Sequence, residues 1–355
     1  MTGPLPNWLL PFMIPLSWVY RAGIARRNRA FDRDPHRVQR LPIPVISIGN
    51  ITTGGTGKSP MVAWTVEQLL AANHRPVIAM RGYGARPGEL SDEETEHMQR
   101  LSGRGVEIIV HPDRHHALSG YLSAHSEVDC VVLDDGFQHR QLHRDLDIVL
   151  IDATRDTFSD RLLPAGHLRE PLENLGRADA VVVSRAEAPD ESIARAVQRH
   201  HEKPPVAWSR HGWSTLEVFD GEGIRKEEVA WLKGRRVMSL LGIGNPAAMR
   251  QQIENAGATI IHDFPVRDHQ HYDPRKSRFL RKVTDLMTAD QKTHALLTTG
   301  KDWVKLRSLI DWDQWTIPIV IPTLELDFVS GENELRSLVL STLADGSASR
   351  SDPRN

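Results

Sequence analysis

Short apolar runs recur along the chain, separated by longer stretches in which apolar residues have helical spacing. The runs are rich in Val and Ile and are bounded by Gly, Pro, Asn or Asp, which is typical of strands buried on both faces of a parallel sheet. In the first half they occupy residues 42–50, 76–80, 106–110, 128–133, 147–151 and 178–183. This alternation predicts an α/β fold with a parallel sheet and helices on both faces.

A change of pattern after residue 204 predicts a second domain. Residues 206–235 are rich in Trp and partly alternating, and Asp220-Gly221 suits a hairpin turn. The α/β pattern then restarts, and a chain of 355 residues is long enough for two domains. We expect an N-terminal segment at 1–40, a first domain at 41–205, a β-hairpin linker at 206–235, a smaller α/β domain at 236–345 and a disordered tail at 346–355.

The N-terminal segment has the character of a membrane-surface element. Residues 5–20 carry no charge, but the run is shorter than the ~20 residues of a spanning helix and has Pro11 and Pro15 in its interior. Seven arginines follow between Arg21 and Arg40, against two aspartates, so the charge order is wrong for a signal peptide. The pattern favours a helix lying in the interface of an anionic leaflet on a cytoplasmic face. The alternative is a helix packed on the protein core with solvated arginines.

A glycine-rich stretch between an expected strand and an expected helix predicts a P-loop. Its glycines let backbone N–H groups turn toward phosphate oxygens, Lys58 would reach the β- and γ-phosphates, and the hydroxyl of Ser59 would bind Mg²⁺. The strict pattern begins with Gly where this chain has Thr52, so the match is to a variant. The first domain is therefore expected to be P-loop NTPase-like. Its predicted nucleotide-binding residues are Thr53, Gly54, Gly55, Thr56, Gly57, Lys58 and Ser59.

Acidic residues follow two of the other expected strands. Asp134 and Asp135 come directly after an apolar run, which places them near the P-loop if the two strands are neighbours. One of these carboxylates would hold Mg²⁺, and the sequence leaves open which one. Asp152, after residues 147–151, is a weaker candidate for the same role.

Composition and charge give no indication of nucleic-acid binding or of a zinc site. The net charge of −2 provides no basic field that would favour nucleic acid. The single cysteine, Cys130, lies in an apolar run and is expected to be a buried thiol. The 17 histidines show no zinc-ligand spacing.

Read together, these segments resemble the tetraacyldisaccharide 4'-kinase family of lipid A synthesis. The most specific block is the double aspartate followed by Gly-Phe-Gln-His at residues 134–139. The other matching blocks are Ile48-Gly49-Asn50 with the P-loop, Arg81-Gly82-Tyr83-Gly84, Leu163 to Glu170, Gly242 to Pro246, Asp268-His269 and Lys301-Asp302. One block departs from the family pattern, because residues 91–94 read Ser-Asp-Glu-Glu where Gly-Asp-Glu-Pro is common.

The resemblance implies an activity and a site. The expected reaction is Mg²⁺-dependent transfer of the ATP γ-phosphate to the 4'-hydroxyl of tetraacyldisaccharide 1-phosphate, a glycolipid, at the cytoplasmic face of the bacterial inner membrane. Asp113 matches the family's general base, His269 its assisting histidine, and Lys58 completes the catalytic set. The blocks also contain the residues expected at the substrate: Asn50, Arg81, Tyr83, Gln138, His139, Arg169 and Glu170. Arg169 and Glu170 could instead form a structural ion pair.

Three other classes of P-loop protein fit the sequence less well. A GTPase or metallochaperone would carry an N/T-K-x-D motif, whereas the lysine of residues 299–302 is displaced by one position. A membrane-partitioning ATPase switch would have Lys where this chain has Thr53. A kinase of small metabolites would have no use for the N-terminal segment.

Overall fold

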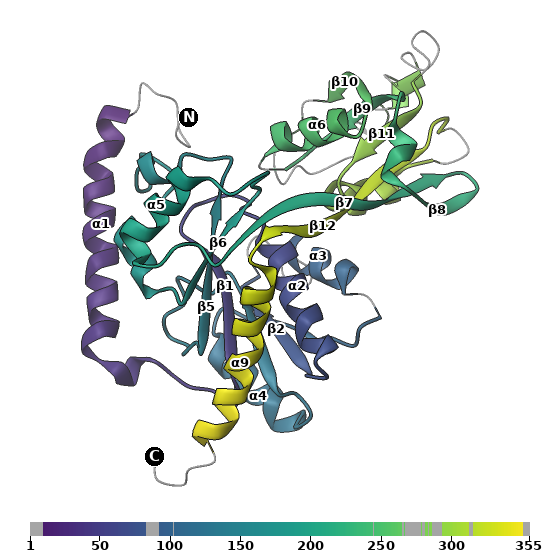
Figure 1. Ribbon diagram of the computed structural model, residues 1–355. Coiled ribbons are helices and arrows are strands. Elements are labelled where there is room, and N and C mark those ends of the chain that lie inside the picture. The colour runs from purple at the N-terminus through teal and green to yellow at the C-terminus, as the bar shows by residue number, and fades with distance from the viewer. Residues whose placement is uncertain are drawn as a thin grey trace. The chain divides into compact units, whose positions relative to one another are not determined.

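The computed structural model describes residues 10–82, 92–101, 103–243, 245–264, 293–311 and 315–350, with isolated positions between 266 and 285 (Figure 1). The chain forms two compact units. The first unit comprises residues 1–211 and 326–355, and the second comprises residues 212–325. The chain passes between them within β7 (Ala207–Asp220) and again within β12 (Ile319–Ser330).

A parallel sheet forms the centre of the first unit. Its strands lie in the order β7-β6-β5-β1-β4-β2-β3. They are β1 (Val45–Asn50), β2 (Pro76–Met80), β3 (Ile108–Val110), β4 (Cys130–Asp134), β5 (Leu146–Asp152), β6 (Ala180–Ser184) and the start of β7. Parallel pairing places the carboxyl ends of β1, β4 and β5 at one edge of the sheet. The loops after these strands therefore lie next to one another.

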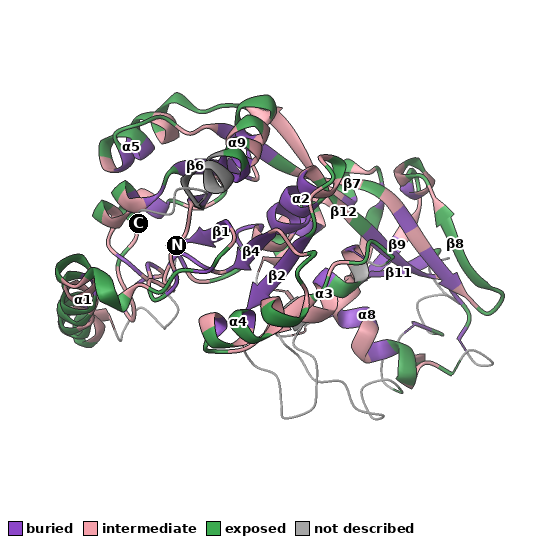
Figure 2. Cartoon of the chain, turned by 90° about the horizontal axis from the view of Figure 1, so that it is seen from below, coloured by how far each residue is buried: buried purple, intermediate pink, exposed green. Residues whose placement is uncertain are grey.

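Helices cover both faces of this sheet because alternate residues of each strand point to opposite sides. In β4, Cys130 and Val132 pack with α2 and α9, whereas Val131 and Leu133 pack with α4. Figure 2 shows β1, β2 and β4 buried along their length. The helices are α1 (Leu10–Arg33), α2 (Lys58–Ala71), α3 (Asp92–Arg100), α4 (Arg114–Ala124), α5 (Glu191–His201) and α9 (Glu332–Arg350).

The described part of the second unit includes the remaining strands and the helices α6 and α8. Its strands lie in the order β10-β9-β11-β12-β7, and β8 pairs with β7 in an antiparallel hairpin. This hairpin closes at residues 220–223, which confirms the predicted turn. The elements are β8 (Gly223–Glu227), β9 (Arg236–Leu240), α6 (Pro246–Asn255), β10 (Thr259–Phe264), β11 (Ala295–Thr298) and α8 (Gly300–Leu306).

The predicted fold class is confirmed, and β2 has the predicted bounds. The division of the chain differs from the expected one. Residues after Leu326 belong to the first unit because Leu335, Val339 and Leu343 of α9 enter the core beside α2 (Figure 1). The expected tail from residue 346 is helical as far as Arg350. The hairpin at 206–235 is part of the second unit's sheet rather than a separate linker, since β7 also borders β12.

Helix α1 has one packed side and one exposed side. One side packs on the first unit, where Ser17 Oγ donates to the carbonyl of Leu162 at 2.9 Å. The other side exposes large apolar side chains, namely Phe12, Leu16, Trp18 and Val19. Among the described residues, no helix has both the length and the apolarity needed to cross a bilayer.

Candidate active site

The P-loop is held in shape by the neighbouring loops. Gly54 and Gly57 have φ values of 89° and 87°, a region that favours glycine, and α2 begins directly after Gly57. The N–H of Thr53 donates to His167 O at 2.8 Å, and Arg155 Nη1 donates to Thr53 O at 3.0 Å. On the other side of the loop, Ser184 Oγ donates to Thr56 O at 2.8 Å. The backbone that would surround a phosphate group is therefore held by the protein's own hydrogen bonds.

Asn50 links the end of β1 to this loop. Its Nδ2 donates to Thr56 Oγ1 at 2.6 Å, and its side-chain oxygen accepts from Arg169. The backbone carbonyl of Asn50 accepts from Gln138 Nε2 at 2.8 Å. Two of the predicted substrate residues, Asn50 and Gln138, thus brace the site in this structure.

Asp135 is the centre of a compact group of charges. Arg169 bridges both of its carboxylate oxygens at 2.8 Å each, and Lys58 Nζ lies 3.5 Å from Oδ1. Burial would raise the pKa of Asp135, but the charges of Lys58 and Arg169 and the hydrogen bonds from Arg169 hold it well below its usual range. Asp135 therefore stays ionised and orients the two cations.

Asp134 has different surroundings. His97 Nε2 lies 2.7 Å from Asp134 Oδ2, whereas Oδ1 is buried and has no hydrogen-bond partner among the described residues. A buried carboxylate oxygen without a donor is costly unless a cation completes its surroundings. The oxygen chemistry of Asp134 and of Ser59, the second residue of α2, suits Mg²⁺. The other carboxylate, Asp135, has both oxygens bound by arginine.

The predicted base, Asp113, caps a helix. Its Oδ1 accepts from the N–H of His116 at 3.1 Å at the start of α4. That hydrogen bond lowers the pKa of the exposed Asp113 carboxylate, so it is ionised at neutral pH. Burial lowers the pKa of His139 to about 4, and the charge of Arg114 contributes to the lowering. The negative charge of Asp113 acts in the opposite direction and raises that pKa. Asp113 and His139, a predicted substrate residue, therefore interact electrostatically.

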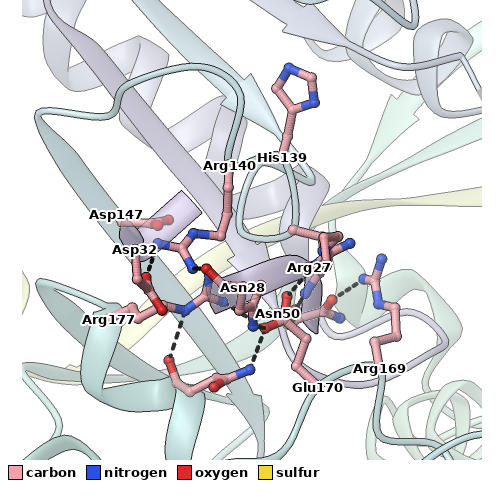
Figure 3. A network of polar contacts seen from close by, with 12 residues as sticks. Arg27, Asn28, Asp32, Asn50, His139, Arg140, Asp147, Arg169, Glu170 and Arg177 are labelled. Carbon is pink, nitrogen blue, oxygen red and sulfur yellow. Dashed lines mark hydrogen bonds and ion pairs between the residues drawn. The ribbon is translucent and has the colours of Figure 1, made fainter. Parts of the chain in front are cut away.

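Arg169 and Glu170 do not pair with each other, and each serves a different partner (Figure 3). Arg169 also donates from Nε to Thr52 O at 2.9 Å, so it joins the P-loop to Asp135. Glu170 is fully buried and accepts hydrogen bonds from four side chains. These are Arg27 Nη2 at 3.2 Å, Asn28 Nδ2 at 3.3 Å, Asn174 Nδ2 at 2.6 Å and Arg177 Nη2 at 2.7 Å.

Tyr20 of α1 donates to the backbone carbonyl of Arg169 at 2.9 Å. Together with Arg27 and Asn28, it attaches the N-terminal helix to the segment that carries Arg169. Helix α1 therefore contacts the segment that carries Arg169 directly. The sequence pattern did not indicate these contacts.

The remaining predicted site residues are Arg81, Tyr83, Asp152 and His269. Tyr83 and His269 lie outside the described residues, and Arg81 is exposed at the end of β2. Asp152, the weaker metal candidate, is instead held by Arg185 Nη1 at 2.6 Å and by the N–H of Thr154 at 2.9 Å. Arg155 and Arg185 follow the carboxyl ends of β5 and β6, the two strands that come next to β1 on one side of the sheet. Their position after expected strands was the feature of the sequence that could have marked them.

A strand, a P-loop with a paired lysine, and a carboxylate pair at the end of the adjacent strand define a P-loop phosphotransferase. A profile described as tetraacyldisaccharide-1-P 4'-kinase, LpxK, matches residues 9–344. The chain belongs to the tetraacyldisaccharide 4'-kinase family.

Named relatives agree with this assignment. A tetraacyldisaccharide 4'-kinase of Chlorobium phaeobacteroides is 30% identical over 96% of this chain and 98% of its own length. A tetraacyldisaccharide 4'-kinase of Bordetella parapertussis is 35% identical over 91% of both chains. A crystal structure described as "apo"-form LpxK of Aquifex aeolicus in complex with ATP matches with a TM-score of 0.66 and 27% identity, over 94% of this chain and 99% of that one.

Proposed function

We propose that this chain transfers the γ-phosphate of ATP to the 4'-hydroxyl of a tetraacyldisaccharide 1-phosphate. The observation that carries the proposal is the P-loop in which Asp135 pairs with both Lys58 and Arg169. Phosphoryl transfer spreads negative charge over the equatorial oxygens of the transferred group. Two cations already fixed in place can stabilise that charge without reorganising.

Asp134 and Ser59 are the residues that would hold Mg²⁺ beside the nucleotide. The ion would supply positive charge to the β- and γ-phosphates, as it does in P-loop enzymes. Asp135 has a different role, because Arg169 and Lys58 already occupy its oxygens.

Asp113 is proposed as the general base that accepts the proton of the sugar hydroxyl, with His269 assisting. An alcohol is a weak nucleophile at neutral pH, and a positioned base contributes on the order of 10²–10⁴-fold to such a step. Because Asp113 also caps α4, replacing it with alanine would confuse the two roles. Asp113→Asn is cleaner, since asparagine is an equally good helix cap but a far weaker base.

We also propose that α1 docks the protein peripherally on the cytoplasmic face of the inner membrane, where the glycolipid lies. The exposed side of α1 carries Phe12, Leu16 and Val19 at helical spacing, and Arg26 and Arg29 are exposed further along. Apolar side chains in the interface with arginines near anionic headgroups suit such docking.

The test of activity is transfer of γ-³²P from ATP and Mg²⁺ to tetraacyldisaccharide 1-phosphate in detergent micelles, with Lys58→Ala as the blank. We expect transfer that the blank lacks, and a fall in kcat for Asp113→Asn without a matching rise in the KM for ATP. ATP binding without transfer would refute the proposed reaction. A defect of Asp113→Asn confined to KM would refute the base role.

The test of membrane docking is fractionation of a Phe12→Ser/Leu16→Ser/Val19→Ser variant with vesicles that contain anionic lipid. Deleting residues 1–40 is unsuitable because it would also remove Arg27 and Asn28 from Glu170. Ile224→Ser is the control, since Ile224 is an equally exposed apolar residue in β8. Docking by α1 requires that the triple variant stays in the supernatant while the control sediments with the vesicles.

A further inference from the structure

A buried histidine of α3 is joined to one carboxylate of the aspartate pair. His97 Nε2 lies 2.7 Å from Asp134 Oδ2, and the side chains of the two residues are 0% and 3% exposed. We propose that His97 is a positioning residue that fixes Asp134 so that its other oxygen serves the metal ion. The inference rests on the proposed Mg²⁺-dependent reaction and extends it to a residue outside the family blocks.

The two oxygens of Asp134 have complementary surroundings. Oδ2 has a hydrogen-bond partner in His97, whereas Oδ1 has none among the residues that the structure describes. A donor on one oxygen of a metal-binding carboxylate restricts its rotation and directs the second oxygen. Without His97, the carboxylate would keep its place at the end of β4 but lose the contact that sets its orientation.

Helix α3 holds the histidine firmly beside the P-loop. Leu101, which follows the helix, is buried in the core cluster that includes α2. On the same helix, the charges of Arg100 and Glu96 act on His211. The ring of His211 in turn packs against Gly57 of the P-loop. Helix α3 thus interacts with Asp134 through His97, and with His211 beside the P-loop through Glu96 and Arg100.

The same helix gives the altered block a role. Helix α3 begins at Asp92, within the residues that read Ser-Asp-Glu-Glu in this chain. The block therefore overlaps the start of the helix that carries His97, and it can affect the site through that helix.

The experiment compares two substitutions of similar size, His97→Gln and His97→Met. Glutamine keeps an N–H donor at about the reach of His Nε2, and methionine removes it. Binding of Mn²⁺, as a substitute for Mg²⁺, is measured by electron paramagnetic resonance on the full chain with a non-hydrolysable ATP analogue. We expect Mn²⁺ binding about 10–100-fold weaker for His97→Met and close to wild type for His97→Gln. Affinity for the analogue without metal should not change.

His201→Met is the matched control. His201 is another buried histidine of the first unit, and its ring contacts the backbone carbonyls of Ala178 and Lys203. It should bind Mn²⁺ as wild type does. If His97→Met is not folded by circular dichroism, His97→Asn replaces it, because the asparagine amide is too short to reach Asp134 and predicts the same loss.

Two results would overturn the proposal. One is unchanged Mn²⁺ affinity in the variant that lacks the donor. The other is an equal loss in His97→Gln, which would show that the ring itself, and not the hydrogen bond, matters. The Mn²⁺ titration needs no glycolipid, so a wild-type protein without kinase activity would refute the proposed substrate and leave the role of His97 decided by the metal measurement.

Discussion

Replacing Glu170 with alanine should destabilise the first unit far more than replacing Glu173 with alanine. Both carboxylates bind an arginine of α1, Glu170 with Arg27 and Glu173 with Arg21, and both N–O distances are 3.2 Å. They differ in burial, because the side chain of Glu170 is 0% exposed and that of Glu173 is 64% exposed. The two substitutions therefore measure what burial adds to the attachment of α1.

The expected difference follows from the partners that are left behind. Removing Glu170 deprives the side chains of Arg177, Asn174 and Asn28 of their acceptor in a buried site. Breaking a buried ion pair from one side costs about 3–5 kcal/mol, whereas an exposed pair contributes about 0–1 kcal/mol. Each kcal/mol moves the unfolding midpoint of a unit of this size by about 2–4 °C. Glu170→Ala should therefore lower the midpoint by about 6–20 °C, and Glu173→Ala by less than about 4 °C.

The assay is thermal unfolding in detergent, followed by circular dichroism, together with ATP binding at a temperature where both variants are folded. Because Arg169 is adjacent to Glu170 and Tyr20 holds its carbonyl, ATP binding should weaken only in Glu170→Ala. Equal losses of stability in the two variants would refute the reasoning. They would show that the buried contact of α1 with Glu170 contributes no more to stability than its exposed contact with Glu173.

Three further predictions concern the P-loop and its neighbours. Gly57→Ala should lower the unfolding midpoint because its φ is +87° and a methyl group would overlap the ring of His211, whereas Gly55→Ala, with 3.8 Å to the nearest atom, should change it little. Burial lowers the pKa of His211 to about 3 and that of His139 to about 4, below the unfolded value near 6.5. The unfolded state therefore binds more protons than the folded state at pH 5, so the free energy of unfolding from urea titrations should fall between pH 7 and pH 5. The fall should be smaller in His211→Gln, and a fall of the same size as in the wild type would contradict this reasoning. Arg169→Lys should reduce kcat/KM by an amount equivalent to about 1.5–3 kcal/mol in the transfer assay, because lysine cannot bridge both oxygens of Asp135.

Local patterns were sufficient to predict most elements and the phosphate-binding part of the site. The strand at 76–80 is bounded by turn residues, and the P-loop combines glycines with a helix start, so both are defined by neighbours in the sequence. The return of α9 to the first unit was not predictable in this way. Its apolar residues are as compatible with a second core as with the first, and only tertiary packing decides.

The same limit applies to the site. The sequence indicated Asp134 and Asp135 as a pair but could not distinguish them, because their difference lies in partners far along the chain. Arg169 binds one of them and His97 the other. Likewise, the sequence left open whether the arginine-rich N-terminal segment lies on a membrane or packs on the protein core. It could not show that Arg27 reaches a carboxylate 143 residues away.

The position of Cys130 has a practical consequence for labelling. It is the only cysteine of the chain, it is fully buried in β4, and burial raises the pKa of its thiol far above the usual range. Thiol reagents react with the thiolate of accessible cysteines, so the folded wild-type protein should be inert to maleimides. A cysteine introduced in place of exposed Trp18 would then be a single reactive handle, ready for a spin label or fluorophore without prior removal of the native residue.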